Sequence, residues 1–355
     1  MSGPPRVSLT DLADAAAGGT IGGPLLEADG SVRDPLIAVD LDGAGTLDDV
    51  AVERAIHRAR TADRLMIGVL PDCGRRPPHP RLLDALDLTL TGVAASSGPE
   101  SVGVADPHTA LLDLHEAVTR NPQAALVLRD VLRTTRTLPV QAALDVESYA
   151  YSTLLAGPEF ARWLAARGPR PLPPEADAPV LVERVGGDRL HVTLNRPERR
   201  NAYGRQLRDA LVDALEIALL DDQVTRVVLD GAGPSFCAGG DLDEFGTAPD
   251  LVTAHLVRTR GGAGRLVNRL ADRIEVRVHG ACVGAGIEIP AFAGTLTARP
   301  DATFRLPEVS MGLIPGAGGT VSIPRRIGRW RTLYMALTGA AIDVATAREW
   351  RLIDS

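Results

Sequence analysis

Two glycine-rich segments and a pair of glutamates have the residue types and spacing that chemistry requires. The segments are residues 231–241 (GAGPSFCAGGD) and 279–288 (HGACVGAGIE), each after a β-branched run and before a helical pattern. Each can therefore direct unpaired backbone N–H groups into one pocket. We expect Glu288 and Glu308 to place two carboxylates beside it. Directed donors stabilise an oxyanion and carboxylates move protons. The set predicts chemistry on a thioester without a metal or redox cofactor.

The glycine segments predict one backbone donor each. Asp241 and Glu244 have the spacing of a capping box, so we expect a helix to begin at Asp241. Gly240 would then lie at the positive end of that helix with its N–H unpaired. The second segment repeats the pattern before an apolar helix and predicts a second donor at Ala285. For either segment alone, a tight turn that only joins a strand to a helix remains an equally good interpretation.

The two glutamates are predicted to have raised pKa values. Glu288 lies in residues 286–293 (GIEIPAFA), which are otherwise apolar or small, so its carboxylate is expected to be buried. Glu308 follows a strand-like run and a proline. Desolvation raises both carboxyl pKa values toward neutrality, and mutual repulsion raises at least one further. The alternatives are an ion pair with an arginine for Glu288 and a solvated loop position for Glu308.

Other chemistry-bearing residues are interpreted as packing groups. Residues 316–320 (GAGGT) lack the lysine of a phosphate-binding loop, and we interpret them as a close-packing turn in the pocket wall. Tyr203, His279 and Cys282 are interpreted as packing beside the site. No Ser/His/Asp set occurs in a usable order, which disfavours an acyl-enzyme.

Composition excludes several classes of protein. The chain has 355 residues, 45% of them hydrophobic and 23% charged, as in an ordinary globular protein. A net charge of −7 and the lack of a basic stripe argue against nucleic-acid binding. No apolar run has the length of a membrane span, and the N-terminus lacks a secretion signal. Three widely spaced cysteines, Cys73, Cys237 and Cys282, fit reduced thiols in a cytoplasm, and none belongs to a zinc-like cluster. The sequence contains no lysine, which excludes Schiff-base and lysine-base chemistry.

A proline-rich linker at residues 167–179, with five prolines, separates two parts of the chain. Before it, patterns predict strands at 36–41 and 64–70, a helix at 48–60 and either type at 82–90. Four helices with short connectors are predicted at 106–120, 121–136, 139–156 and 157–166.

After the linker, residues 180–185 and 190–194 predict a hairpin around the turn 186–188. A helix at 207–220 follows, then strands at 227–229 and 275–278. Pairs of strands followed by one helix predict a superhelix of ββα turns within an α/β fold, because a doubly wound sheet lacks that rhythm.

These residues resemble the crotonase (enoyl-CoA hydratase/isomerase) superfamily. The stretches that carry the resemblance are 195–202 (NRPERRNA), 235–242 (SFCAGGDL), 280–288 (GACVGAGIE) and 304–320 (FRLPEVSMGLIPGAGGT). The resemblance covers about residues 180–355 closely. It implies a crotonase-like superhelix with a helical subdomain and a small, degenerate α/β part at the N-terminus.

The resemblance also implies roles for the four central residues. Gly240 and Ala285 correspond to the backbone donors of the oxyanion hole. Glu288 and Glu308 keep the twenty-residue spacing of the two acids in hydratases. The implied activity is that of an enoyl-CoA hydratase or dehydratase. The alternatives are isomerisation, thioester hydrolysis, cofactor-free oxygenation, or a non-catalytic subunit that pairs with an active crotonase.

Coenzyme A would enter as part of the substrate, with no other cofactor and no metal. The resemblance implies that the backbone of Asn201 and Ala202 meets the adenine. Arginines are expected to hold the coenzyme A phosphates in place of the usual lysines, namely Arg196, Arg199 and Arg200. The expected partner is an acyl-CoA thioester, not a nucleic acid or a membrane. A cytoplasmic homo-oligomer, a trimer or dimer of trimers, is implied, possibly with another crotonase-like subunit.

The chain order is unusual for such a protein. Residues 114–166 resemble the helical tail that family members carry after the core. We therefore expect a permuted or degenerate-tandem arrangement in which these helices pack on the core. The expected parts are a small α/β part (1–105), a helical subdomain (106–166), the linker (167–179) and a crotonase-like catalytic core (180–355).

Overall fold

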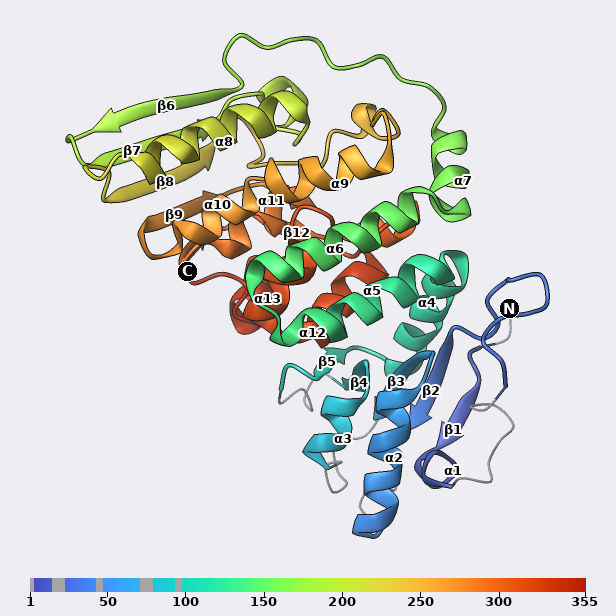
Figure 1. Cartoon of the computed structure of the whole chain (residues 1–355). Coiled ribbons are helices and arrows are strands. Elements are labelled where there is room, and N and C mark those ends of the chain that lie inside the picture. The colour runs from blue at the N-terminus through green and yellow to red at the C-terminus, as the bar shows by residue number, and fades with distance from the viewer. Residues whose placement is uncertain (1–2, 15–22, 43–46, 71–78, 93–97) are drawn as a thin grey trace. The chain divides into compact units, whose positions relative to one another are not determined.

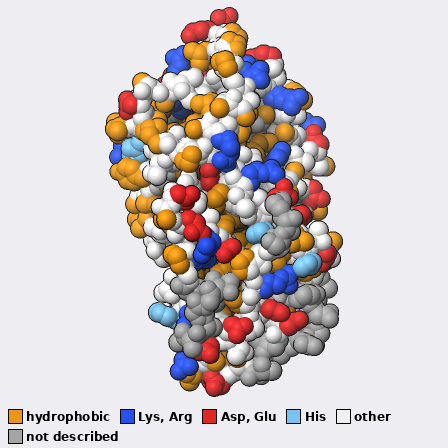
Figure 2. All heavy atoms as spheres, turned by 90° about the vertical axis from the view of Figure 1, so that its right-hand side faces the viewer, with side chains coloured by type: hydrophobic (Ala, Val, Ile, Leu, Met, Phe, Trp, Pro, Cys, Tyr) orange, Lys and Arg blue, Asp and Glu red, His pale blue; other side chains and the backbone are white. Residues whose placement is uncertain are grey.

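The computed structural model describes residues 3–14, 23–42, 47–70, 79–92 and 98–355. Its internal contacts divide the chain into two compact units, residues 1–133 with 328–338 and residues 134–327 with 339–355. Cys237 and Cys282 are free and buried, whereas Cys73 lies outside the described residues. No helix among the described residues has both the length and the apolar character to cross a membrane. Figure 2 shows one face, on which described arginine and acidic side chains are interspersed.

The first unit is built on a parallel five-stranded sheet in the order β1-β2-β3-β4-β5. Its strands are β1 (Arg6–Ser8), β2 (Leu36–Asp40), β3 (Leu65–Leu70), β4 (Leu88–Gly92) and β5 (Ser101–Val104). Its helices are α1 (Leu9–Ala13), α2 (Asp49–Thr61), α3 (Pro80–Ala85), α4 (Pro107–Arg120) and α5 (Pro122–Thr134). The expected strands 36–41 and 64–70 are confirmed as β2 and β3. The ambiguous stretch 82–90 divides between α3 and β4.

A buried acid, Asp87, ties helices to this sheet. Its carboxylate accepts hydrogen bonds from Met66 N (2.9 Å), Arg129 Nε (3.2 Å) and Arg133 Nε (2.8 Å). Arg329 Nη1 lies 3.5 Å from Asp87 Oδ1. A buried charge is tolerated only when it is paired and hydrogen-bonded. The network therefore fixes α5 and residues 328–338 to the sheet of the first unit.

The second unit contains two sheets. The five-stranded sheet has the order β11-β9-β8-β7-β6 and the three-stranded sheet the order β10-β12-β13. The strands are β6 (Val180–Val185), β7 (Arg189–Leu194), β8 (Arg226–Gly231), β9 (Ile274–Val278), β10 (Ala281–Val283), β11 (Thr295–Ala298), β12 (Thr303–Arg305) and β13 (Ile342–Asp343). The β6–β7 hairpin is antiparallel, and Gly186 and Gly187 both have positive φ in the three-residue turn 186–188, a conformation that glycine adopts readily.

The helices of the second unit connect these strands. They are α6 (Val140–Leu155), α7 (Pro158–Arg167), α8 (Arg205–Leu220), α9 (Leu251–Arg260), α10 (Gly264–Arg269), α11 (Ala285–Glu288), the first part of α12 (Gly319–Thr338) and α13 (Val344–Glu349). α12 is kinked at Gly328, which has a φ of +83° and marks the boundary between the units.

The predicted superhelix is confirmed by the order in which segments pair. Each turn of the superhelix adds one strand to the five-stranded sheet. The short segment that follows this strand pairs with the corresponding segment of the previous turn. β9 is followed by β10 and β11 by β12, and β10 and β12 are parallel neighbours. After β8, Cys237 pairs with Cys282 of β10, and after β7, Tyr203 pairs with Gly240. All of these pairings are parallel, as a spiral of ββα units requires.

The four predicted helices before the linker are confirmed as α4 to α7, but they are shared between the units. α4 and α5 belong mainly to the first unit, and α6 and α7 to the second. The domain boundaries expected from the sequence therefore stay a prediction.

Helices α6 and α7 pack on the core that follows them in sequence. α6 runs alongside α9 (Figure 1), where Arg258 Nε donates to Ser148 Oγ at 3.0 Å. On α7, the Trp163 ring lies 6.0 Å from that of Phe245. Gly312 has a φ of +73°, and a Cβ there would lie 2.6 Å from the backbone nitrogen of Phe160. Helices α6 and α7 and the core after the linker thus form one packed unit.

The expected helix at Asp241 is wrong. The chain makes only one 3₁₀ turn there, Leu242–Glu244. The reason is that Glu244 Oε2 accepts the N–H of Arg205 at the start of α8 (2.7 Å), and Asp241 N donates to Tyr203 O (3.3 Å). The capping-box spacing therefore serves a neighbouring helix.

The apolar helix expected after Ala285 is also shorter than its pattern. α11 ends at Glu288, and Pro290–Phe292 continue as a 3₁₀ turn. Pro290 has no N–H to donate to the carbonyl of Gly286, so the α-helical ladder cannot continue.

Candidate active site

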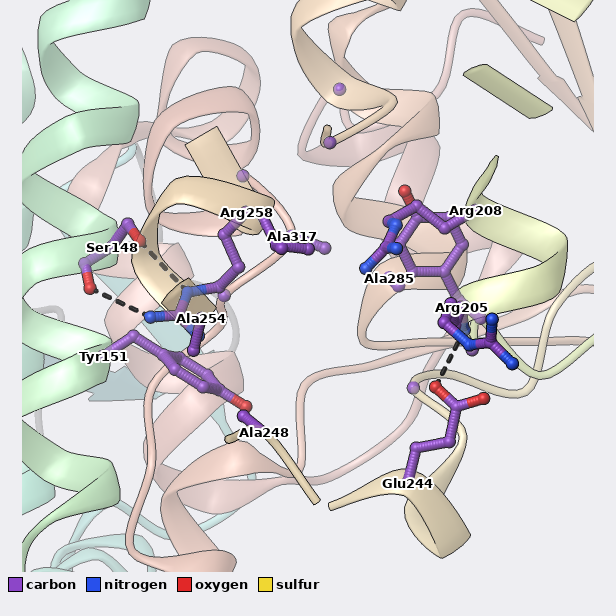
Figure 3. Close-up of a pocket in the computed structure, with 18 of the residues that line it drawn as sticks. Ser148, Tyr151, Arg205, Arg208, Glu244, Ala248, Ala254, Arg258, Ala285 and Ala317 are labelled. Atoms are coloured by element: carbon purple, nitrogen blue, oxygen red, sulfur yellow. Dashed lines mark hydrogen bonds between the residues drawn. The ribbon is translucent and has the colours of Figure 1, made fainter. Parts of the chain in front are cut away.

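A cavity of about 410 Å³ lies in the second unit, lined by residues of α6, α8, α9, α11 and the loop at 316–318. In Figure 3, Ser148, Tyr151 and Arg258 lie on one side of it and Arg208 and Ala285 on the other. The four residues predicted to be catalytic all line this cavity, namely Gly240, Ala285, Glu288 and Glu308.

The first glycine segment is held in place by Asn201. This residue is fully buried, and its Nδ2 donates to the carbonyls of Ala232 (2.9 Å), Ser235 (3.0 Å) and Phe236 (3.1 Å). Its Oδ1 accepts the N–H of Arg196 at 2.7 Å. The asparagine side chain is therefore an internal clamp on the turn that precedes Gly240.

The two glycine segments contact each other directly. Val283 N donates to Cys237 O at 3.1 Å, and a Cβ at Gly286 would overlap the same carbonyl. Glycine at 286 thus permits the close approach of the two backbones. Among the described residues, neither Gly240 N–H nor Ala285 N–H donates a hydrogen bond to another backbone or side-chain group. The structure places two unused backbone donors on the wall of one cavity.

The carboxylates of Glu288 and Glu308 both lie beside Gly284. This glycine has a φ of +49°, and a Cβ there would overlap Glu308 Oε1 and lie 3.6 Å from Glu288 Oε1. Glu288 Oε2 accepts the N–H groups of Ala317 (2.7 Å) and Gly319 (2.9 Å). Glu308 Oε2 is buried and has no hydrogen-bond partner among the described residues. The two acids therefore have unequal surroundings.

Burial raises the carboxyl pKa values, as predicted. Glu288 and Glu308 are only 2% and 8% exposed. Burial, then the charge of Glu308 and that of Glu147, raise the pKa of Glu288 well above its usual range. Burial raises the pKa of Glu308 to about 8. The pair can therefore hold a proton at neutral pH.

A third buried acid, Glu147 of α6, was missed by the sequence analysis. It lines the cavity, and burial raises the pKa of its carboxyl group to about 7. The available signal was its place on the same helical face as Ala143 and Leu154, both of which are buried. An acid on an apolar helical face is costly without partners, and so is a candidate for a specific role.

The residues predicted to bind coenzyme A do not line the cavity; Arg205 and Arg208 do. Arg199 makes hydrogen bonds to Asp241 and Asp243. Arg196 is buried and donates to Glu198 and to Pro174 O. Arg200 is exposed, and Ala202 N donates to Arg199 O at 3.1 Å. The coenzyme A roles of Asn201, Ala202 and these three arginines stay predictions.

The residues interpreted as packing groups have internal partners. Tyr203 Oη accepts the N–H of Ala263 at 3.2 Å, and His279 Nε2 lies 2.9 Å from Gly233 O. Cys282 is fully buried, and burial raises the pKa of its thiol.

Comparisons with known proteins match this part of the chain. A family model described as enoyl-CoA hydratase/isomerase matches residues 189–355. The chain is 35% identical over 178 residues to 1,2-epoxyphenylacetyl-CoA isomerase of Escherichia coli (strain K12), covering 49% of this chain and 68% of that protein. The chain belongs to the enoyl-CoA hydratase/isomerase family. It is thus a member of the crotonase superfamily, as the motifs predicted.

Further relatives cover a similar share of the chain. It is 34% identical over 164 residues to 2,3-dehydroadipyl-CoA hydratase of the same Escherichia coli strain, covering 46% of this chain and 64% of that protein. A crystal structure of an enoyl-CoA hydratase from Mycobacterium smegmatis matches with 29% identity and a TM-score of 0.46, covering 50% of this chain and 69% of that one. The crotonase match thus spans about two thirds of the length of these relatives.

Proposed function

We propose that this crotonase acts on acyl-CoA thioesters as an enoyl-CoA hydratase or dehydratase. One observation carries the proposal: two unused backbone N–H groups and two buried carboxylates line a single cavity. The similarity to a hydratase and an isomerase of acyl-CoA thioesters supports it. The substrate assigned to the whole protein, an acyl-CoA thioester, is likewise proposed.

The proposed mechanism uses the unequal surroundings of the acids. The thioester carbonyl accepts hydrogen bonds from Gly240 and Ala285, which stabilise the enolate as charge develops. Burial raises the pKa values of both carboxyl groups, so that the pair holds a proton. Two backbone N–H groups oppose this effect at Glu288, whereas Glu308 Oε2 has no donor among the described residues, and we therefore assign the proton to Glu308. Glu288 then takes a proton from the water that adds to C3, and Glu308 gives a proton to C2. Dehydration is the reverse sequence.

The expectations on coenzyme A binding, cofactors, oligomeric state and cellular location are also proposals. Arg205 and Arg208 at the cavity are better placed than the three predicted arginines to meet coenzyme A phosphates. We propose no cofactor beyond the coenzyme A of the substrate, which unchanged turnover after chelator treatment would support. A homo-oligomer and a cytoplasmic location are proposed on the family resemblance and the cysteine usage.

The test follows loss of the conjugated enoyl-thioester absorbance with straight, branched and aromatic enoyl-CoA substrates. We expect turnover by the native chain, and its loss in both Glu288→Gln and Glu308→Gln with thioester binding retained. Glu183→Gln, on the exposed face of β6, makes the same chemical change away from the cavity and should keep native turnover. Full turnover in either active-site variant would contradict the mechanism.

Double-bond isomerisation is a second candidate, favoured by the family model, whose description names an isomerase of enoyl-CoA beside the hydratase. An isomerase needs one carboxyl group to move a proton between two carbons, and Glu308, with an unpaired buried oxygen, suits that role. In that case Glu288→Gln would retain isomerisation of a 3-enoyl thioester, whereas Glu308→Gln would abolish it. Hydration requires both acids, so the Glu288 variant separates the two functions.

A further inference from the structure

The glycine loop at 316–320 is held by two carboxylates that alternate along its backbone. Ala317 N and Gly319 N donate to Glu288 Oε2. The intervening Gly318 N and the following Thr320 N donate instead to Glu147. Consecutive amides of the loop thus donate alternately to Glu288 and to Glu147. Neither carboxylate can therefore shift without disturbing the donors of the other.

Glu147 is completely engaged by this loop. Its Oε1 accepts Gly318 N at 2.8 Å, and its Oε2 accepts Thr320 N at 2.9 Å and Thr320 Oγ1 at 2.7 Å. The residue is 2% exposed. Both oxygens are thus used by the protein, which leaves Glu147 suited to act through the loop and not on a substrate.

The loop has little room to adopt another position. Gly318 has a φ of +106°, and a Cβ at Gly319 would lie 2.6 Å from Glu288 Cγ. The loop backbone therefore lies directly against the side chain of Glu288. A side chain that fixes this backbone also fixes the orientation of that carboxylate.

We propose that Glu147 is a positioning residue for Glu288, acting through the alternating amides of residues 316–320. This inference rests on the proposed function, in which Glu288 is the base that activates water. It assigns to α6, which precedes the core in the chain, a part in orienting the catalytic acid of that core. A displacement of about 1 Å at a reacting group lowers rates by about 100-fold.

Other charged groups face Glu147 and bear on any pH effect. Arg258 of α9 lies near enough to lower the pKa of Glu147, and Arg258 also packs over the Tyr151 ring at 4.7 Å. The charge of Glu147 raises the pKa values of both Glu288 and Glu308. The loop amides act in the opposite direction on Glu288, since they stabilise its ionised form.

Two variants separate the loop from the charge. Glu147→Gln removes the charge and leaves a single acceptor oxygen. In the native protein, the donors from Gly318 and Thr320 are shared between two oxygens. Thr320→Val keeps the charge and removes only the hydroxyl bond. Asp145→Asn is the matched control, because it removes one charge from the same helix at a residue that hydrogen-bonds Gln141. In each variant, kcat and KM are measured against pH, and hydrogen–deuterium exchange is measured for the peptide containing 316–320.

We expect Glu147→Gln to lower kcat by about 10- to 100-fold with KM within about threefold, and Thr320→Val to do so less strongly. Loop exchange should rise in both variants. The acid limb of the kcat profile, which is the pH range over which kcat falls on acidification, should move to higher pH. The reason is that Glu288 loses donors that favour its ionised form. Asp145→Asn should match the native protein in every measurement.

Three results would overturn the inference. The first is unchanged kcat in Glu147→Gln, and the second is a raised KM alone, which would make Glu147 part of the binding wall. The third is an acid limb that moves to lower pH without a change in loop exchange, which would mean that only the charge of Glu147 acts. If the native protein has no turnover, the proposed function fails separately. The exchange measurement then decides whether Glu147 holds the loop, and unchanged exchange would refute it.

Discussion

Replacing Glu308 with glutamine should change how stability depends on pH. The carboxyl group is 8% exposed and has a pKa of about 8 in the folded protein, against 4.5 for the free group. The folded state therefore binds this proton more tightly than the unfolded state. The stabilisation is fully present below about pH 4.5 and is lost as the pH rises through about 8.

The size of the effect follows from the shift in pKa. One unit corresponds to about 1.4 kcal/mol, so between pH 5 and pH 8 the native protein should lose roughly 3 to 4 kcal/mol that the variant keeps. Glu308→Gln should therefore lie within about 1 kcal/mol of the native protein at pH 5 and become the more stable of the two at pH 8. The free energy of unfolding is measured by denaturant titration at pH 5, 6.5 and 8.

The control is Glu183→Gln on the exposed face of β6, whose pH curve should run parallel to that of the native protein. If the difference between Glu308→Gln and the native protein is the same at all three pH values, Glu308 does not titrate with a raised pKa. The assignment of Glu308 as the protonated acid would then lose its physical basis.

Three further predictions concern the backbone donors, the glycine beneath the acids and the first unit. Ala285→Pro removes one N–H at the first position of α11, where proline is tolerated, and should lower kcat by about 100- to 1000-fold with thioester binding retained. Gly284→Ala places a methyl group against Glu308 Oε1 at a positive φ, and should lower kcat by about 100-fold in the same absorbance assay. Asp87→Asn breaks a buried ion-pair network and should lower the free energy of unfolding by about 3 to 5 kcal/mol in denaturant titrations; a loss below about 1 kcal/mol would contradict the network's role.

Local patterns were enough to predict most elements and the central residues of the site. Continuous apolar runs predicted β2 and β3, the turn 186–188 between two short strand patterns predicted β6 and β7, and Asp106 with Pro107 marked the start of α4. Glu288 was recognisable because an acid amid apolar residues needs a reason to be there, and Glu308 because it keeps the twenty-residue spacing that the family resemblance implies. Apart from that spacing, such signals lie within a few residues of the feature that they predict.

The features that were missed depend on contacts between distant segments. Glu244 was predicted to cap its own helix, but its carboxylate serves α8, some 39 residues earlier. Glu147 and Thr320 are 173 residues apart, and no local pattern pairs them. The arginines near Asn201 were predicted to meet phosphates, yet Arg199 is held by Asp241 and Asp243, 42 and 44 residues away.

The position of α6 in the chain has a consequence for how the site becomes ordered. The donors of Glu288 lie only 29 and 31 residues beyond it, so core residues alone can bring that acid to its loop. The donors of Glu147 lie 171 and 173 residues beyond it, and their pairing must close a far longer loop. Loop-closure entropy rises with the logarithm of length, so this pairing is the less favourable of the two. The proline-rich linker at 167–179 offsets part of that entropy by restricting the chain between α7 and β6. The core is therefore able to form the acid pair first, and the docking of α6 then completes the hydrogen bonds of the catalytic loop.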